Sequence, residues 1–102
     1  MSKEPNPLFD VPDVTCTVIS QEGHCDHNCK VGKTFHIKHG VPPAGMCPHA
    51  VHTFFPFLQG LLFGASYPWE PDPDIARVAC PDWENPVVFE LRRLPKAPKE
   101  GE

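Results

Sequence analysis

The sequence predicts a small α+β domain with elements in the order β-β-α-β-β, in which one main helix packs across a mainly antiparallel sheet. Four short segments contain apolar and polar residues in alternation, as strands do, and one central segment has apolar residues at helical spacing. The 14 prolines among 102 residues disfavour long helices and favour short elements joined by turns. A single domain is expected, because a chain of this length rarely builds two cores.

Two strands are predicted ahead of the helix. In the first, residues 14–19, Val14, Cys16 and Val18 occupy alternate positions, so one face is more apolar than the other. The second covers residues 34–38, where Phe35 and Ile37 alternate with polar side chains. Both are short, as strands of a small sheet usually are.

The helix is predicted over residues 48–63, where apolar side chains recur every three or four positions. Pro48 suits the first turn, and Gly64 suits the end. Pro56 lies inside the helix and is expected to kink it or to leave one backbone carbonyl without a partner.

Two further strands are predicted after the helix, at residues 75–80 and 87–92, joined by a turn with a proline at each end. Asp72 and Asp74, just before the first of them, are interpreted as part of a solvated loop. The predicted core consists of Val14, Val18, Phe35, Ile37, Phe54, Leu58, Leu61, Val78, Val87 and Phe89.

The chain is expected to consist of an extended arm (1–12), one domain (13–94) and a polar tail (95–102). The arm has no apolar run typical of a signal peptide, which predicts a cytoplasmic protein with reduced cysteines. The net charge of −4 argues against a nucleic-acid-binding module.

Residues 39–69 contain no Asp, Glu, Lys or Arg. A membrane span is nevertheless not expected, because the apolar run within them is far shorter than the roughly 20 residues that a spanning helix needs. The helix has more apolar side chains than one face can pack against a small sheet. A homo-oligomer is therefore expected, and a dimer is the most common form.

Four of the five cysteines are predicted to lie in loops or at the ends of elements, where proteins usually present metal ligands. Cys25 and Cys29 share one loop, Cys47 directly precedes the helix, and Cys80 ends a strand. Cys47 and Cys80 are each followed by proline, which fixes the backbone beside the sulfur. A helix start also favours a thiolate, the form that binds metals. We expect these four to converge and Cys16 to lie apart.

Four cysteines can hold an iron–sulfur cluster, including [4Fe–4S], or a zinc ion. The single close pair is less typical of zinc, so the sequence favours a small iron–sulfur protein with a redox or Lewis-acid role. Three alternatives remain: a zinc-stabilised structural domain, a metal-free binding or regulatory domain with packed thiols, and an enzyme with Cys47 as nucleophile. Neither a redox partner nor a small-molecule substrate is indicated.

Other polar groups are weaker candidates. Histidines near the four cysteines are possible substitute ligands or proton donors. Asp82 follows Cys80-Pro81 and is interpreted as a turn residue. The six histidines are, in order, His24 and His27 beside Cys25, His36 and His39 as exposed strand-end residues, and His49 and His52 on one face of the helix.

The motifs together resemble a family of small, uncharacterised bacterial and archaeal proteins of about this length. They are Gly-x-Cys followed by Val-Gly, then Gly-x-Cys-Pro before a helix, then Ala-Cys-Pro-Asp. Cys25, Cys47 and Cys80 carry the resemblance, which extends from about Val14 to Arg93. Cys29 occupies a position where the family often has histidine, and alternation of Cys and His suits a metal ligand. The resemblance implies a site but no established activity.

Overall fold

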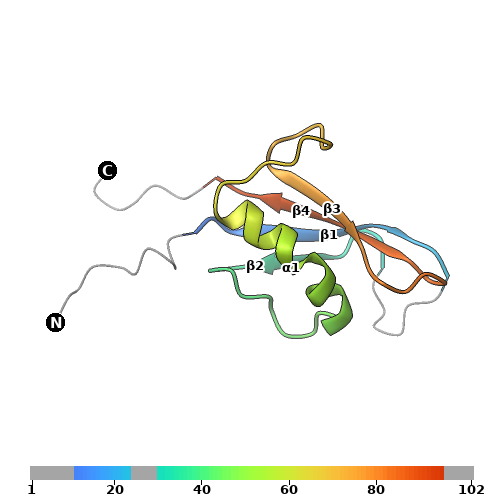
Figure 1. Ribbon diagram of the computed structural model, residues 1–102. Helices are drawn as coiled ribbons and strands as arrows, with labels where there is room; N and C mark the ends of the chain where they lie inside the picture. The colour runs from blue at the N-terminus through green and yellow to red at the C-terminus, as the bar shows by residue number, and fades with distance from the viewer. Residues whose placement is uncertain (1–10, 24–29, 96–102) are drawn as a thin grey trace, which may run out of the picture.

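The computed structural model describes residues 11–23 and 30–95 (Figure 1). It contains one helix and four strands, and the α+β prediction is confirmed. Their order is the predicted one, and β1 extends two residues beyond its predicted end. The elements are β1 (Val14–Gln21), β2 (Thr34–Ile37), α1 (Pro48–Leu62), β3 (Ile75–Ala79) and β4 (Val87–Arg93).

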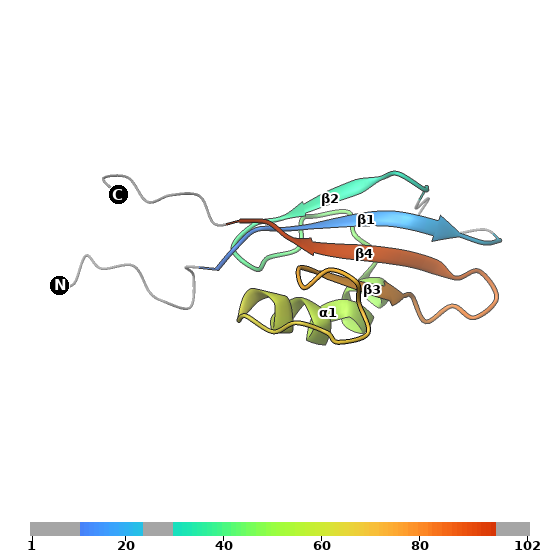
Figure 2. The ribbon, with the colours of Figure 1, turned by 90° about the horizontal axis from the view of Figure 1, so that it is seen from above.

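The strands of the described residues form one antiparallel sheet in the order β2-β1-β4-β3 (Figure 2). Phe89 of β4 pairs with Val18 of β1 on one side and with Val78 of β3 on the other. These three buried side chains therefore lie on the same face of the sheet. Helix α1 covers this face and runs along β3 and β4 (Figure 2).

The core lies between α1 and this face. Among the predicted core residues, Phe35 is the exception: it is only partly buried, on the edge strand β2, with the ammonium group of Lys33 5.0 Å from its ring centre. The core contains more side chains than the sequence predicts. The buried side chains that the prediction did not include are Cys16, Ala50, Leu62, Ile75, Ala76 and Leu91.

Both ends of α1 follow from the sequence. Pro48 occupies the first turn, and Gly64, with φ of 93°, follows the last turn in the left-handed conformation that glycine adopts without strain. The N–H of Ala65 donates to the carbonyl of Gly60 at 2.8 Å and closes the helix end. The helix continues through Pro56, which has no N–H to donate to the carbonyl of His52. No helix of the described residues is long and apolar enough to cross a bilayer.

Arg93 of β4 connects the C-terminal end of α1 to the sheet. Its guanidinium donates to the carbonyls of Leu61 at 2.8 Å and Ala65 at 3.0 Å, and its side chain is only 15% exposed. It also donates to the carboxylate of Asp74 at 3.0 Å and to the carbonyl of Pro73 at 2.9 Å. A cation at this position satisfies the carbonyl of Leu61 in the last turn of α1 and that of Ala65, just beyond the helix end.

Asp72 and Asp74 lie in a loop with partly exposed side chains, as predicted, but both carboxylates also form ion pairs with β4. Asp72 accepts a hydrogen bond from Arg92 at 3.0 Å, and Asp74 pairs with Arg93. Aspartates just before a strand are typical of turns, but β4 presents two adjacent arginines beside them. The two ion pairs join the segment after α1 to β4.

Glu70 forms hydrogen bonds to the outer edge of strand β3. Its carboxylate accepts the backbone N–H of Arg77 at 2.8 Å and the Arg77 side chain at 2.7–2.8 Å. The Glu70 side chain is 2% exposed, whereas that of Arg77 is 46% exposed. Burial raises the pKa of Glu70, but the hydrogen bonds and charge of Arg77 outweigh it and the net pKa is below 4.5. The pKa of Asp72 is also lowered, by the N–H of Asp74 and then by Arg92.

These lowered pKa values predict loss of stability in acid. A carboxylate with a lowered folded-state pKa stabilises the fold above its unfolded pKa, and this contribution is lost as the pH falls through the folded-state value. We expect the free energy of unfolding in urea to be nearly level between about pH 7 and pH 5, and to fall below about pH 4.5. Glu70→Gln should flatten the acid slope, and Glu84→Gln, at an exposed turn position, should leave it unchanged. An equal effect of both variants would contradict the role given to Glu70.

Gly60 gives a second stability prediction. A Cβ at Gly60 would meet the hydroxyl of Tyr67, which donates to the carbonyl of Phe57 at 3.1 Å. Alanine normally favours a helix over glycine by about 0.5–1 kcal/mol, but here crowding should reverse the sign. We expect Gly60→Ala to lower the free energy of unfolding by about 1 kcal/mol. In a Tyr67→Phe background, which removes the hydroxyl, the same change should cost much less, and an unchanged cost in a double-mutant cycle would exclude this contact as the cause.

Candidate metal centre

Cys47 is the residue that caps the N-terminal end of α1. Its backbone is extended, with φ of −61° and ψ of 124°, and its carbonyl accepts the N–H of Val51 at 3.0 Å. Its thiol makes no capping hydrogen bond, and the side chain is partly buried against the core. Pro48 sets this geometry, because its ring fixes φ at the first helical position. The sulfur is therefore held at the start of a helix and remains partly accessible.

Cys80 directly follows β3 and continues its pairing with β4. Its N–H donates to the carbonyl of Val87 at 2.8 Å, and the N–H of Val87 points to the Cys80 sulfur at 3.3 Å. The register places Cys80 on the same face as Val78 and Val87, the face that α1 covers. Like Cys47, it is a partly buried free thiol packed against the core. An N–H directed at sulfur stabilises a negative charge there, which suits a metal-bound thiolate.

Cys47 and Cys80 lie at the same end of the domain. Helix α1 and β3 run in opposite directions, so the start of α1 and the end of β3 come together at one end (Figures 1 and 2). Two of the four predicted ligands, 33 positions apart in the chain, therefore come from the same end and the same side of the sheet.

Cys25 and Cys29 lie outside the described residues, as do His24 and His27. In residues 11–23 and 30–95, no three His, Cys, Asp or Glu side chains form a group that can hold a metal ion.

A bulge in β1 orients the chain just before Cys25. Val18 pairs with Phe89 but Ser20 pairs with Val88, so Ile19 is an extra residue. After the bulge, Gln21 pairs with Val87 and lies in the same row across the sheet as Cys80. Bulges redirect side chains in this way and often occur beside functional sites.

The chain before Cys25 continues along the β3–β4 turn. The N–H of Glu22 donates to the carbonyl of Pro86 at 3.0 Å, and Gly23 lies against the side chain of Asn85. Gly23 has φ of 71° and leaves no room for a Cβ. The first described segment therefore ends, at Gly23, beside the turn that begins after Cys80. Cys25 follows Gly23 by two residues, a distance of at most about 7 Å in an extended chain.

Cys16 lies in a different part of the sheet. It is fully buried in β1 and pairs with Leu91, four residues along β4 from Val87, the partner of Cys80. At about 3.4 Å per residue, this separates the two cysteines by roughly 13 Å along the strands. The register thus places Cys16 and Cys80 in different rows of the sheet.

The other candidate side chains of the described part are histidines and Asp82. None of them forms a hydrogen bond or ion pair with the thiol of Cys47 or Cys80. His49 and His52 are exposed on α1, and the carbonyl of His49 accepts from Thr53. His36 lies 3.2 Å from the carboxylate of Asp13, across the sheet from this end. Asp82 accepts hydrogen bonds from the N–H of Glu84 and of Asn85 and from the Asn85 amide, which confirms its interpretation as a turn residue.

Arg93, whose guanidinium donates to three backbone carbonyls and the Asp74 carboxylate, was not singled out from the sequence. The signal for it is weak: an arginine pair at the end of a strand resembles an ordinary solvated end. Only the pairing of β4 with β1 and the packing of α1 show that it reaches helix carbonyls.

No protein-family model, curated protein or solved structure matches this chain. The likeness to small bacterial and archaeal proteins therefore remains a prediction from motifs. The class that the described residues define is an α+β domain with two partly accessible cysteine thiols at one end.

Proposed function

We propose that the chain is a small metal protein in which Cys25, Cys29, Cys47 and Cys80 bind an iron–sulfur cluster, with zinc as the alternative metal. One observation carries the proposal: Cys47 and Cys80, far apart in sequence, lie at one end of the helix-covered face, and the N–H of Val87 points at the Cys80 sulfur. Packed structural thiols need no such donor.

The number of protein ligands determines the chemistry. Four thiolates close the coordination shell, which suits electron transfer or structural support. Three leave one metal position open for Lewis-acid chemistry on a bound substrate. Cys29 decides between these cases, because without it three cysteine ligands remain.

The test is anaerobic purification of the full chain, followed by visible spectroscopy and by metal and acid-labile sulfide analysis. A brown protein with equal amounts of iron and sulfide supports the cluster. A colourless protein with stoichiometric zinc supports the zinc alternative. Protein without either metal, after expression with both metals supplied, contradicts the metal site, and one hyper-reactive thiol in that protein would favour Cys47 as a nucleophile.

The proposal includes a cytoplasmic location, which the free thiols of Cys47 and Cys80 support. Self-association is part of the same proposal and rests on apolar side chains that α1 leaves uncovered. Phe55 is 42% exposed, and a groove of about 640 Å³ beside it is formed by Met46, Val51 and neighbouring residues. A dimer is expected by light scattering at high micromolar concentration, and a monomer there would contradict it.

A further inference from the structure

The edge strand β2 has backbone groups that point away from the sheet. Val18 and Lys33 share a hydrogen bond of 2.9 Å, and alternate pairs of an antiparallel ladder are hydrogen-bonded. Thr34 and His36 therefore lie at positions that do not bond to β1, and their N–H and C=O groups face outward. Within residues 11–23 and 30–95, no hydrogen bond engages these four groups.

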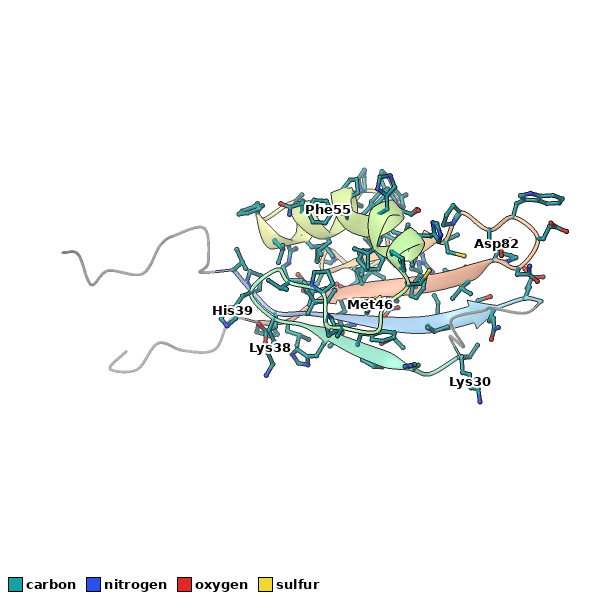
Figure 3. All side chains as sticks on the ribbon, turned by 90° about the horizontal axis from the view of Figure 1, so that it is seen from below. Lys30, Lys38, His39, Met46, Phe55 and Asp82 are labelled. Atoms are coloured by element: carbon teal, nitrogen blue, oxygen red, sulfur yellow. The ribbon has the colours of Figure 1, made fainter. Side chains whose placement is uncertain are left out.

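The same edge is basic. Figure 3 shows Lys30 near one end of β2 and Lys38 and His39 near the other. Lys33 and His36 lie between them, and all five side chains are exposed. The sequence has no acidic residue between Asp26 and Glu70, whereas its net charge is −4. Five of the eight acidic residues of the described part lie instead toward the other edge, near β3: Glu70, Asp72, Asp74, Asp82 and Glu84. Glu22 and Glu90 belong to the β1 and β4 region, and Asp13 alone among the eight contacts β2, at 3.2 Å from His36, so the positive charge of this edge comes from its lysines.

We infer that β2 is a docking edge for an acidic protein segment, which adds as an extended strand. Its backbone would pair with the outward groups of Thr34 and His36, as in other complexes formed by strand addition. Its carboxylates would lie near Lys30, Lys33 and Lys38. A segment of four to five residues matches the four residues of β2, Thr34–Ile37. This inference uses no cysteine and stands or falls independently of the metal centre.

Charge and hydrogen bonding favour an acidic peptide over a second copy of this chain and over a nucleic acid. Pairing of β2 with a second copy would bring two sets of basic side chains together, and like charges across strands are destabilising. A nucleic acid would satisfy the lysines, but its phosphates are acceptors and cannot pair with the outward C=O groups of Thr34 and His36. A peptide backbone supplies both donors and acceptors.

The test is titration of the full-length, ¹⁵N-labelled chain with a short peptide of alternating glutamate and valine. The largest amide shifts are expected at Thr34 and His36, and binding should weaken with added salt. The same peptide carrying backbone N-methyl groups keeps its charge but loses donors, and should bind at least about tenfold more weakly. Lys33→Glu combined with Lys38→Glu, which leaves the backbone intact, should weaken binding by a similar factor.

His36→Pro removes one outward N–H, and prolines are tolerated on edge strands in this orientation. It should reduce affinity more than His36→Ala, which retains the N–H but also lacks the contact with Asp13. Equal binding of the N-methylated peptide would overturn the inference, as would shifts confined to residues outside β2. Tighter binding of a single-stranded oligonucleotide at the same lysines would overturn it in favour of a phosphate-binding edge.

Discussion

Replacement of Arg93 by alanine is expected to lower the free energy of unfolding by about 3 kcal/mol. The change leaves the carbonyls of Leu61 and Ala65 without their donor and Asp74 without its partner. Hydrogen bonds from charged groups contribute about 1.5–3 kcal/mol each, and part of this is recovered because water reaches the vacated position. Urea denaturation followed by circular dichroism measures the effect.

Arg92 provides the matched control, because it is the neighbouring residue of the same strand. Its side chain is 42% exposed and pairs only with carboxylates, those of Asp72 and Glu90. Arg92→Ala should therefore cost well under half as much as Arg93→Ala. The loss of unfolding free energy in Arg93→Lys is expected to lie between those of Arg92→Ala and Arg93→Ala. A lysine keeps the positive charge, but its ammonium group cannot make the forked contacts of a guanidinium. Similar losses for Arg92→Ala and Arg93→Ala would show that the helix carbonyls do not depend on Arg93.

Replacement of Cys80 or Cys47 by serine is expected to reduce the bound metal to less than about a tenth of that in the native chain. It should also lower stability by several kcal/mol, because metal binding and folding are coupled. Cys25→Ser should do the same. Metal content and the denaturation midpoint, measured on the same anaerobic samples, test both effects together.

Cys16→Ala is the control for these variants, since its register position separates it from Cys80. It should destabilise the fold through packing alone and leave the metal content per folded chain unchanged. Cys29→Ser distinguishes the two forms of the centre: full loss indicates four thiolate ligands, and retained metal with altered spectra indicates three. Equal metal retention in the Cys47 and Cys16 variants would contradict the proposed site.

The fold was predictable because each element has a local signal of its own. Val14, Cys16 and Val18 alternate along β1, Pro48 and Gly64 bound the helix, and two prolines delimit the β3–β4 turn. Strand order was not predictable in the same way. The placement of β4 between β1 and β3 depends on side chains such as Phe89, which pack against both neighbours, and no local pattern shows such a contact.

The candidate site was predictable to a lesser degree. The position of Cys47 at a helix start and of Cys80 at a strand end could be read from the prolines that follow them. That both lie at one end of the domain depends on the opposite directions of α1 and β3. The bulge at Ile19 has no sequence signature, since Ile19 continues a run of strand-forming residues, yet it brings Gln21 into the row of Cys80.

The hydrogen bonds of Arg93 also determine when the domain can form during synthesis. Two of its acceptors, the carbonyls of Leu61 and Ala65, lie 32 and 28 residues earlier in the chain. The pairing of β1 with β4 also cannot be completed earlier, because Val14 at the start of β1 pairs with Arg93 at the end of β4. At about 5–20 residues per second, the ribosome extends the chain for on the order of seconds after α1 is made before these partners emerge. Throughout that interval the apolar face of α1 has no completed sheet to cover it, so the core of the domain closes only after the last strand has been made.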